Sequence, residues 1–501
     1  MKAGATFLLL SLFFTTFSSE AQRCQKEASV LDEYIRTSIK DWNSPGLAVA
    51  VVKNGKVVFT GSYGVQSIDS NKPIDNHTLF ACASTTKAFT AAALGILVDE
   101  RKLFWDDKVI KHIPGFQLCD PYVTRELTIR DLLTHRCGIG NTDYMWGWMT
   151  ISGDSALHKI REVQPSYSLR SSFIYQNLMY LAAGVVIENV SGKTWQEFMK
   201  ERIFIPLDMT ETYALYQNVK DKSNLASAHL YYENEIVQID HISADAIAPA
   251  GAMWSSISDM AKWMQFLTNN GVVKGDTLIK LSTFNELFKP QQIVPSYEFY
   301  ATQEIVKPKW TTYGLGWFQH DYNGNMVQVH TGSLPGMVAI AGLIREYNVG
   351  VYVMGNLDHN EIRHVILYAA FDLFTTKELS RDWNKELKAL YTRRSDSHDE
   401  HNHEPVRLPD TKPTVPNEAI IGKYNHHHYG LIEVSKKDGR LRFNLNNTVK
   451  GTMTHWHYDT YQVIFDEQWY GKVMVSFRKN GEPIIKYLET FGVRFDYTKS
   501  L

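Results

Sequence analysis

The sequence has no excess of charge of one sign, few cysteines and almost no long apolar runs. Lysine and arginine number 52 and aspartate and glutamate 54 among 501 residues, and no basic stripe stands out. Nucleic-acid-binding proteins usually carry such an excess or stripe, so we expect no nucleic-acid partner. The sequence also lacks a glycine-rich phosphate loop and a Gly-x-Ser-x-Gly nucleophile elbow, which disfavours the hydrolases that depend on that elbow. The length exceeds one ordinary core, so at least two domains are expected.

One apolar run is present, at the N-terminus, and it is typical of a secretory signal. Lys2 precedes a run rich in leucine and phenylalanine, and the small residues Ser19 and Ala21 stand where a signal peptidase reads the chain. We therefore expect residues 1–21 to be removed and the protein to be exported, to the periplasm or the extracellular space. No other run approaches the ~18 apolar residues of a membrane-spanning helix, so we expect no stable membrane insertion after cleavage. An uncleaved N-terminal anchor is the alternative.

The few cysteines and the clustered histidines do not indicate a metal site. The cysteines are Cys24, Cys82, Cys119 and Cys137. Their spacing fits no common zinc pattern. In an exported protein they could oxidise, and Cys119–Cys137 is the first pair to test, with free buried thiols as the alternative. The histidines within 398–403 and 426–428 are explained by a polar linker and a turn, so we expect no metal and no other cofactor.

Changes in composition divide the chain into a large and a small folded region. Residues 22–390 combine amphipathic helical segments with short apolar strands, which indicates an α+β domain. Asn54-Gly55 between two β-branched runs predicts a hairpin near its start. Residues 391–416 are strongly polar and carry prolines, so we expect a linker that a protease cuts first. Residues 417–501 alternate short apolar runs with turns, which predicts an all-β domain shaped like a barrel or sandwich.

The first motif with chemical meaning is Ser84-x-x-Lys87. A serine hydroxyl is a weak nucleophile until a base removes its proton. If a helix starts near Ser84, Lys87 lies one turn further on the same face, and its amine can reach the hydroxyl. The helix N-terminus also directs a backbone N–H toward developing negative charge. The motif is weak alone, because Ser476 and Lys479 repeat it in a predicted strand and a helix cap with a surface lysine would also explain it.

A second motif, Tyr-x-Asn, occurs at Tyr175, Tyr216 and Tyr232. Only the first leads directly into an apolar helix, whereas the other two lie in polar segments. A tyrosine beside a lysine ammonium can have its pKa lowered and carry protons. Asn177 offers a donor and an acceptor to a substrate amide. The alternative is an aromatic core residue followed by a helix cap.

The third motif, His330-Thr331-Gly332, ends an alternating run that predicts a strand. A glycine at a strand edge lets a substrate backbone approach closely. The backbone N–H of Ser333 could then join that of Ser84 in an oxyanion hole. An ordinary strand end is the alternative.

In this order, the three motifs resemble those of the serine penicillin-recognising enzymes, which include class C β-lactamases, D-alanyl-D-alanine carboxypeptidases, D-aminopeptidases and related esterases. The segment Thr128–Ile139 also looks like the class C branch. The resemblance covers roughly residues 28–375, and residues 424–495 resemble the lipocalin-like domain appended to some peptidases of this group. It implies an antiparallel sheet flanked by helices, a mostly helical lobe, and a site in the cleft between them.

The same resemblance implies roles for the motif residues. Ser84 would attack a carbonyl, Lys87 and Tyr175 would pass its proton to the leaving group, and water would release the acyl-enzyme. The residues expected to bind substrate are Asn177, His330, Thr331 and Gly332. The backbone of Ser84 and Ser333 would hold the oxyanion, and no cofactor would be needed.

His330 departs from the lactamase pattern, which has lysine at this position. Histidine there is a feature of the D-aminopeptidase-like members. An ordinary imidazole is mostly neutral at pH 7 and gains its proton toward about pH 6, where it would attract a carboxylate. We therefore expect a peptide, amide or ester substrate, D-residues included. A true β-lactamase and a non-catalytic scaffold or ligand sensor are the alternatives, and a homo-oligomer stays open.

Overall fold

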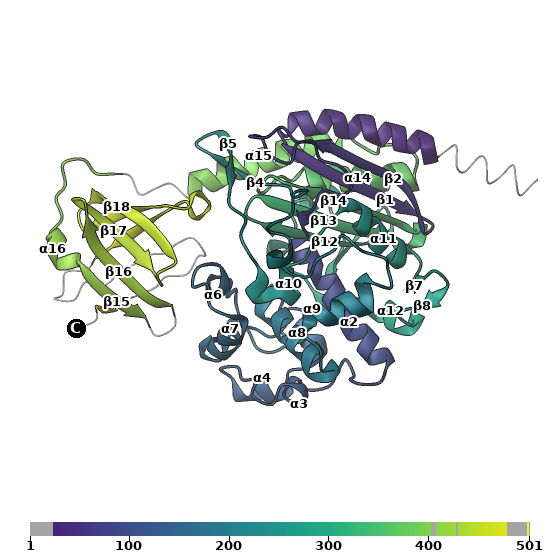
Figure 1. Cartoon of the computed structure of the whole chain (residues 1–501), viewed down its shortest axis with the longest axis horizontal. Helices are drawn as coiled ribbons and strands as arrows, with labels where there is room; N and C mark the ends of the chain where they lie inside the picture. Colours follow the sequence, from purple (N-terminus) through teal and green to yellow (C-terminus); the bar gives the residue numbers. More distant parts are fainter. Residues whose placement is uncertain (1–23, 402–406, 427–428, 478–497, 500–501) are drawn as a thin grey trace, which may run out of the picture.

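The structure is a computed structural model that describes residues 24–401, 407–426, 429–477 and 498–499. Within these residues the chain forms a large α+β domain with a smaller β domain at its side (Figure 1). The predicted fold class is confirmed: an antiparallel sheet flanked by helices, a mostly helical lobe and a C-terminal β domain. The predicted signal peptide, residues 1–21, lies outside the described residues.

An antiparallel sheet forms the centre of the large domain. Its eight described strands have the order β2-β1-β14-β13-β12-β11-β10-β9. Their bounds are β1 (Gly46–Lys53), β2 (Lys56–Gly64), β9 (Gln292–Ile293), β10 (Thr311–Tyr313), β11 (Phe318–Tyr322), β12 (Asn325–Leu334), β13 (Met337–Ile344) and β14 (Val349–Gly355). β1 pairs with β14, which ties the two ends of the domain together. The predicted hairpin joins β1 to β2, with φ of 50° at Asn54 and 70° at Gly55, as a tight turn requires.

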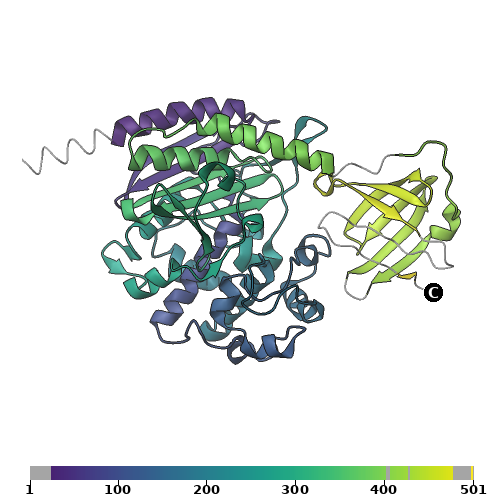
Figure 2. The ribbon, with the colours of Figure 1, turned by 180° about the vertical axis from the view of Figure 1, so that it is seen from behind.

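Helices cover both faces of this sheet because β1 alternates buried side chains between the faces. Leu47, Val49 and Val51 pack against a helix at residues 24–41 and against α14 and α15. The intervening residues of β1 face α11 and the helical lobe. The bounds of the covering helices are α11 (Ile257–Thr268), α14 (Ile362–Thr375) and α15 (Trp383–His401). Figure 2 shows the N-terminal helix beside α15, and Trp42 there donates a 2.8 Å hydrogen bond to Asn384.

The helical lobe lies below the sheet in Figure 1. Its helices are α2 (Thr86–Asp99), α3 (Val109–His112), α4 (Pro121–Glu126), α5 (Ile129–Leu133), α6 (Tyr144–Gly147), α7 (Gly153–Lys159), α8 (Asn177–Ser191), α9 (Trp195–Met199) and α10 (Ala248–Gly251). The domain also contains two further helices, α12 (Leu281–Leu287) and α13 (Gln303–Val306). It contains three short strand pairs as well: β3 (Phe80–Ala81) with β6 (Trp254–Ser255), β4 (Ala228–Tyr232) with β5 (Glu235–Ile239), and β7 (Val272–Val273) with β8 (Asp276–Thr277). α2 and α8 are buried along nearly their whole length, so they form the rigid centre of the lobe.

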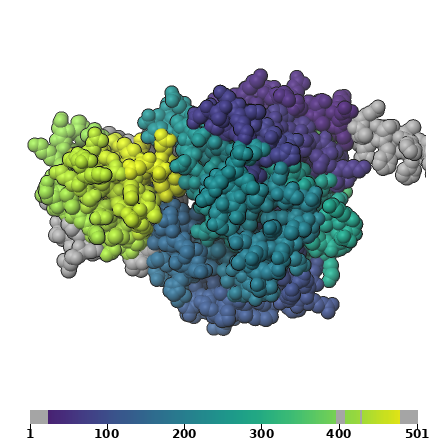
Figure 3. Space-filling view, viewed as in Figure 1, coloured from purple at the N-terminus to yellow at the C-terminus, as the bar shows by residue number. Residues whose placement is uncertain are grey.

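The C-terminal domain is a single curved antiparallel sheet. Its seven described strands have the order β20-β19-β18-β17-β16-β15-β21. The element bounds are α16 (Asn417–Ile420), β15 (Gly422–His426), β16 (Gly430–Lys437), β17 (Arg440–Leu445), β18 (Val449–His457), β19 (Thr460–Phe465), β20 (Lys472–Ser476) and β21 (Thr498–Lys499). Tyr424, Phe443 and Val463 are fully buried in its core. The space-filling view shows this domain resting on the helical lobe (Figure 3).

The predicted linker differs from the structure in its first half. α15 continues to His401, so the boundary at residue 390 falls inside a helix. Trp383, Leu387 and Leu390 are buried against α14, whereas the following turns are polar and exposed, which explains why composition alone suggested a linker. Among the described residues, no helix is both long enough and apolar enough to cross a membrane. Cys119 and Cys137 form no disulfide, and the alternative of a free buried thiol holds for Cys137, whereas Cys119 is free but half-buried.

Candidate active site

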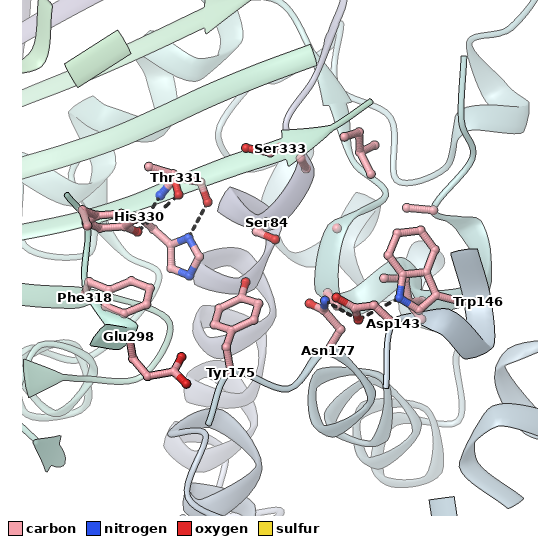
Figure 4. A pocket seen from close by; sticks show the side chains of 17 residues that line it. Ser84, Asp143, Trp146, Tyr175, Asn177, Glu298, Phe318, His330, Thr331 and Ser333 are labelled. Atoms are coloured by element: carbon pink, nitrogen blue, oxygen red, sulfur yellow. Dashed lines mark hydrogen bonds between the residues drawn. The ribbon is translucent and has the colours of Figure 1, made fainter. Parts of the chain in front are cut away.

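A cleft between the helical lobe and the edge of β12 brings most of the predicted site residues together. Its volume is about 320 Å³, at the small end of the ~300–1,000 Å³ usual for small-molecule sites. The predicted residues that line it are Ser84, Tyr175, Asn177, His330, Thr331 and Ser333. Figure 4 shows them converging around Ser84. Lys87 lies buried behind Ser84, and Gly332 contacts the backbone before Ser84.

Ser84 lies in a tight turn directly before α2. The residue before it, Ala83, has a φ of 47°, in the left-handed region that favours glycine. A non-glycine residue held in such a region typically costs ~1–3 kcal/mol and persists only where its surroundings enforce it. Thr85 enforces it here, because its hydroxyl lies 2.8 Å from Cys82 O and 2.6 Å from the Tyr352 hydroxyl. The strained turn directs the Ser84 hydroxyl into the cleft.

Lys87 is a buried amine poised to act as a base. Its Nζ lies 3.1 Å from Ser84 Oγ, 2.7 Å from Asn177 Oδ1 and 2.9 Å from Ala250 O. Burial disfavours the charged form and lowers the pKa of Lys87 to about 7, against a smaller opposing effect of the Asp143 carboxylate. A lysine with this pKa is in large part a neutral amine near pH 7. The predicted contact between Lys87 and Ser84 is therefore present.

Tyr175 stands beside this pair, but its predicted pKa shift was wrong. Its hydroxyl points to Ser84 and bonds with it, and the Lys87 amine lies 4.7 Å from its ring centroid. Burial raises the pKa of Tyr175 well above its usual value, because desolvation of a phenolate outweighs the opposing hydrogen bond with Ser84. The ring packs 4.4 Å from that of His135, whose Nδ1 accepts the Gln176 N–H. Tyr175 is thus a neutral hydroxyl held in a fixed place.

Asn177 begins α8 and is oriented by charged neighbours. Its Oδ1 accepts from Lys87, and its Nδ2 donates to Asp143 Oδ1 at 2.8 Å. Trp146 Nε1 donates to the same carboxylate oxygen at 2.9 Å. One donor and one acceptor of Asn177 are therefore used inside the protein, which leaves its second N–H and second lone pair for a substrate amide.

The edge of β12 supplies the other side of the cleft. The Thr331 N–H donates to the Tyr300 hydroxyl at 3.0 Å, away from β13. Because N–H groups two residues apart in a strand point the same way, the Ser333 N–H points to this edge too. A Cβ on Gly332 would lie 2.2 Å from Cys82 O and 3.1 Å from Ser84 N. Glycine is thus needed so that the strand can touch the serine turn, and its contact with substrate stays a prediction.

His330 does not behave as the charge-switching residue that its sequence position suggested. It is buried, its Nδ1 donates to Thr331 O at 2.7 Å, and its Nε2 accepts from the Tyr313 hydroxyl, 3.0 Å away. Burial, together with the Lys87 charge, lowers the pKa of His330 to about 3. The expected gain of a proton near pH 6 is therefore wrong, because both ring nitrogens serve a neutral imidazole. His330 therefore lines the cleft as an uncharged imidazole.

Sequence reasoning missed the remaining walls of the cleft. The missed polar and aromatic lining residues are Asp143, Trp146, Glu298, Tyr300 and Phe318. A signal existed only for Asp143, which stands at the N-cap position of α6 within a polar turn. Trp146 lies in α6, three residues after Asp143, and Glu298, Tyr300 and Phe318 lie between or within strands far along the chain, where no spacing relates them to Ser84.

The C-terminal domain contacts the segment that forms one of these walls. Trp148, just after α6, packs its ring against Phe465 and Tyr470, with centroids 5.4 and 5.0 Å apart. The Tyr470 hydroxyl donates to Gly147 O at 3.1 Å, and Thr448 Oγ1 donates to Trp148 O at 3.2 Å. The β domain therefore supports α6 from behind, while Asp143 and Trp146 face the cleft.

No metal centre emerges from the described part of the chain. No group of three or more histidine, cysteine, aspartate or glutamate side chains there is placed to hold a metal ion. The side chains of His398, His401 and His403, and of residues 427–428, lie outside the described residues, so that part of the prediction stays a prediction.

Comparisons of the sequence with known proteins agree with this geometry. Residues 31–373 match the family model described as Beta-lactamase, and residues 407–499 match a domain of unknown function, DUF3471. The unguisins hydrolase ungD' of Aspergillus campestris (strain IBT 28561) is 27% identical over 423 residues, which cover 80% of this chain and 76% of that protein. Protein flp of Staphylococcus aureus (strain NCTC 8325 / PS 47) is 25% identical over 353 residues, 70% of this chain and 67% of that protein.

Solved structures share the whole architecture. The octameric penicillin-binding protein homologue from Pyrococcus abyssi has a TM-score of 0.61 at 21% identity and covers 94% of this chain and 99% of that chain. A crystal structure described as SurE has a TM-score of 0.57 at 16% identity and covers 96% of this chain and 100% of that chain. At these identities the likeness shows the fold alone.

Proposed function

This chain belongs to the β-lactamase family, whose model it matches over residues 31–373, and from this premise we propose that it is a serine hydrolase with Ser84 as its acylated nucleophile. The observation that carries the proposal is the pair formed by Ser84 and Lys87. The amine lies 3.1 Å from the hydroxyl, and its pKa of about 7 lets it take a proton at neutral pH.

The proposed reaction has two steps that use the same groups. Neutral Lys87 takes the Ser84 proton as the serine oxygen bonds to the substrate carbonyl carbon. The N–H groups of Ser84 and Ser333 stabilise the oxyanion. As the bond to the leaving amine or alcohol breaks, the proton reaches it through the Tyr175 hydroxyl. Water then attacks the acyl-enzyme, gives its proton to the same relay and releases a carboxylic acid and free Ser84.

We assign peptides, amides or esters, D-residues included, as the substrate class. One relative is named as a hydrolase of unguisins. A β-lactam substrate is disfavoured, because its carboxylate calls for a cation and the neutral His330 stands where lactamases carry lysine. A non-catalytic ligand sensor is disfavoured by the intact contact between Ser84 and Lys87.

The proposal includes export of the protein and is compatible with a homo-oligomer. Export rests on the run from Lys2 to Ala21, and N-terminal sequencing of secreted protein should begin at Gln22. An octamer is described for the Pyrococcus abyssi homologue, so light scattering on the mature chain should test for a homo-oligomer. A mature N-terminus at Met1 would contradict cleavage.

A serine-reactive fluorophosphonate tests the central claim. We expect it to label one residue, and peptide mapping should place the label on Ser84. Labelling of Ser476 would contradict the mechanism, since that hydroxyl lies in β20, bonded to Thr460 at 2.8 Å. A panel of D- and L-aminoacyl amides and esters, with a chromogenic β-lactam, would define the substrate. Stable acylation without turnover would favour the ligand sensor.

A further inference from the structure

The catalytic cleft has an uneven charge that the proposed reaction does not explain. The ionisable side chains at its surface include the carboxylates of Asp143 and Glu298, but no lysine or arginine appears among the described residues that line it. Lys87 is buried behind Ser84 and acts as the base, and His330 is neutral. The guanidinium of Arg363, near β12, is held by Glu361 and by Gly332 O. The cleft therefore attracts cations and repels carboxylates.

The two carboxylates differ in how they are used. Asp143 accepts hydrogen bonds from Asn177 and Trp146, so its charge serves the protein. Glu298 is half-buried at the end of a short turn. Among the described residues, none donates a hydrogen bond to its carboxylate or forms an ion pair with it. Burial alone raises its pKa, which is the behaviour of a carboxylate that lacks a partner. Figure 4 shows it below Phe318 and directed toward Tyr175.

Aromatic rings line the cleft near this carboxylate, and Figure 4 shows Phe318 directly above Glu298. Tyr300 and Phe318 meet with centroids 4.9 Å apart, and the rings of Phe318 and Tyr175 are nearly parallel at 6.4 Å. Ring faces attract a cation that lies within about 6 Å of their centroids. A carboxylate next to such faces suits an alkylammonium group, whose charge meets the carboxylate and whose carbon atoms meet the rings.

We propose that Glu298, with the faces of Tyr300 and Phe318, binds a positively charged amine of the substrate. This subsite rests on the proposed function, because it places the amine in the same cleft as the carbonyl attacked by Ser84. The cleft volume of about 320 Å³ admits only a short group between the amine and that carbonyl. The substrate class is then small amides or esters with a free amino group, either an α-amine or a short basic side chain.

Paired substrates that differ only in charge test the subsite. Alanyl p-nitroanilide, in both D and L forms, is compared with its N-acetyl derivative, and N-acetyl-ornithyl with N-acetyl-norvalyl p-nitroanilide. We expect kcat/KM to favour the charged member of one pair by about 10- to 100-fold, as a hydrogen bond to a charged group allows. Which pair shows the preference tells an α-amine from a side-chain amine. Glu298→Gln should bring that ratio close to one.

Glu33→Gln is the matched control. Glu33 is an exposed carboxylate on the N-terminal helix, on the sheet face opposite the helical lobe, and the change should leave the ratio as in the wild type. A wild-type ratio near one, or the same preference in Glu298→Gln, would overturn the subsite.

Calorimetry decides the matter even without a suitable chromogenic substrate. Benzylammonium should bind the wild-type chain at least tenfold more tightly than Glu298→Gln, and benzyl alcohol should not distinguish them. Equal or absent binding of benzylammonium would refute the subsite. Failure of fluorophosphonate to label Ser84 would instead refute the proposed reaction, so the two failures can be told apart.

Discussion

Acidification through pH 7 should switch off acylation of Ser84, because it protonates Lys87. At the ordinary lysine pKa, only about 1 amine in 3,000 would be neutral at pH 7. With its pKa lowered to about 7, about half of the Lys87 amines are neutral at that pH. Burial therefore raises the fraction of competent base on the order of a thousandfold. Below pH 7 that fraction falls tenfold per unit, which sets an acid limb in the rate profile.

Asp143→Asn should move this limb to lower pH. The carboxylate of Asp143 favours protonated Lys87, so its removal lowers the pKa of the amine further. For each unit of downward movement, the neutral fraction well below the limb rises about tenfold. Trp146→Phe is the control, because it removes one hydrogen bond to Asp143 without changing any charge. Its limb should stay where the wild-type limb lies.

The measurement is the second-order rate of fluorophosphonate labelling between pH 5 and pH 9. This rate reports the pKa values of the free enzyme and needs no knowledge of the natural substrate. A flat wild-type profile, or a limb near pH 10, would refute the role of Lys87 as base. The electrostatic argument would be refuted if the acid limb moved to higher pH in Asp143→Asn. It would also be refuted if the limb moved by the same amount in the Trp146→Phe control.

Three further changes test the site and its supports. Ser84→Ala should abolish labelling and shift thermal unfolding by little; residual labelling at full stoichiometry would contradict it. Gly332→Ala should suppress labelling and destabilise the fold by about 1–3 kcal/mol in denaturant titrations, because its Cβ would lie 2.2 Å from Cys82 O; wild-type labelling would show that the contact is not needed. Trp148→Ala should cost about 3–5 kcal/mol and slow labelling, since its ring packs on Phe465; unchanged values would separate the β domain from the site.

The elements that follow from local patterns could be predicted from the sequence. Lys87 follows Ser84 by one helical turn, and this spacing alone brings the amine to the hydroxyl. The Asn54-Gly55 turn and the alternating run before His330 were equally local, and both lie where their patterns placed them. Such features depend on backbone geometry within a few residues, which the amino-acid types largely determine.

Burial and long-range contacts could not be predicted in the same way. The pKa values of Tyr175 and His330 moved against expectation, because desolvation depends on neighbours from distant strands. Glu298 reaches the cleft from a segment without a motif, more than 200 residues after Ser84. The second half of α15 was assigned to a linker because its exposed turns are as polar as a linker, although Leu390 within the helix is fully buried.

The contact between the two domains links the C-terminal β domain to Asp143 and Lys87 in the cleft through a few neighbouring residues. Trp148 is held by aromatic rings of the C-terminal sheet, and it directly follows α6. The same helix begins directly after Asp143, its N-cap residue, whose carboxylate lines the cleft. That carboxylate orients Asn177 and sets part of the Lys87 pKa. A displacement of the β domain would therefore change the strength of the base as well as the shape of the cleft, which a domain serving only assembly would not do.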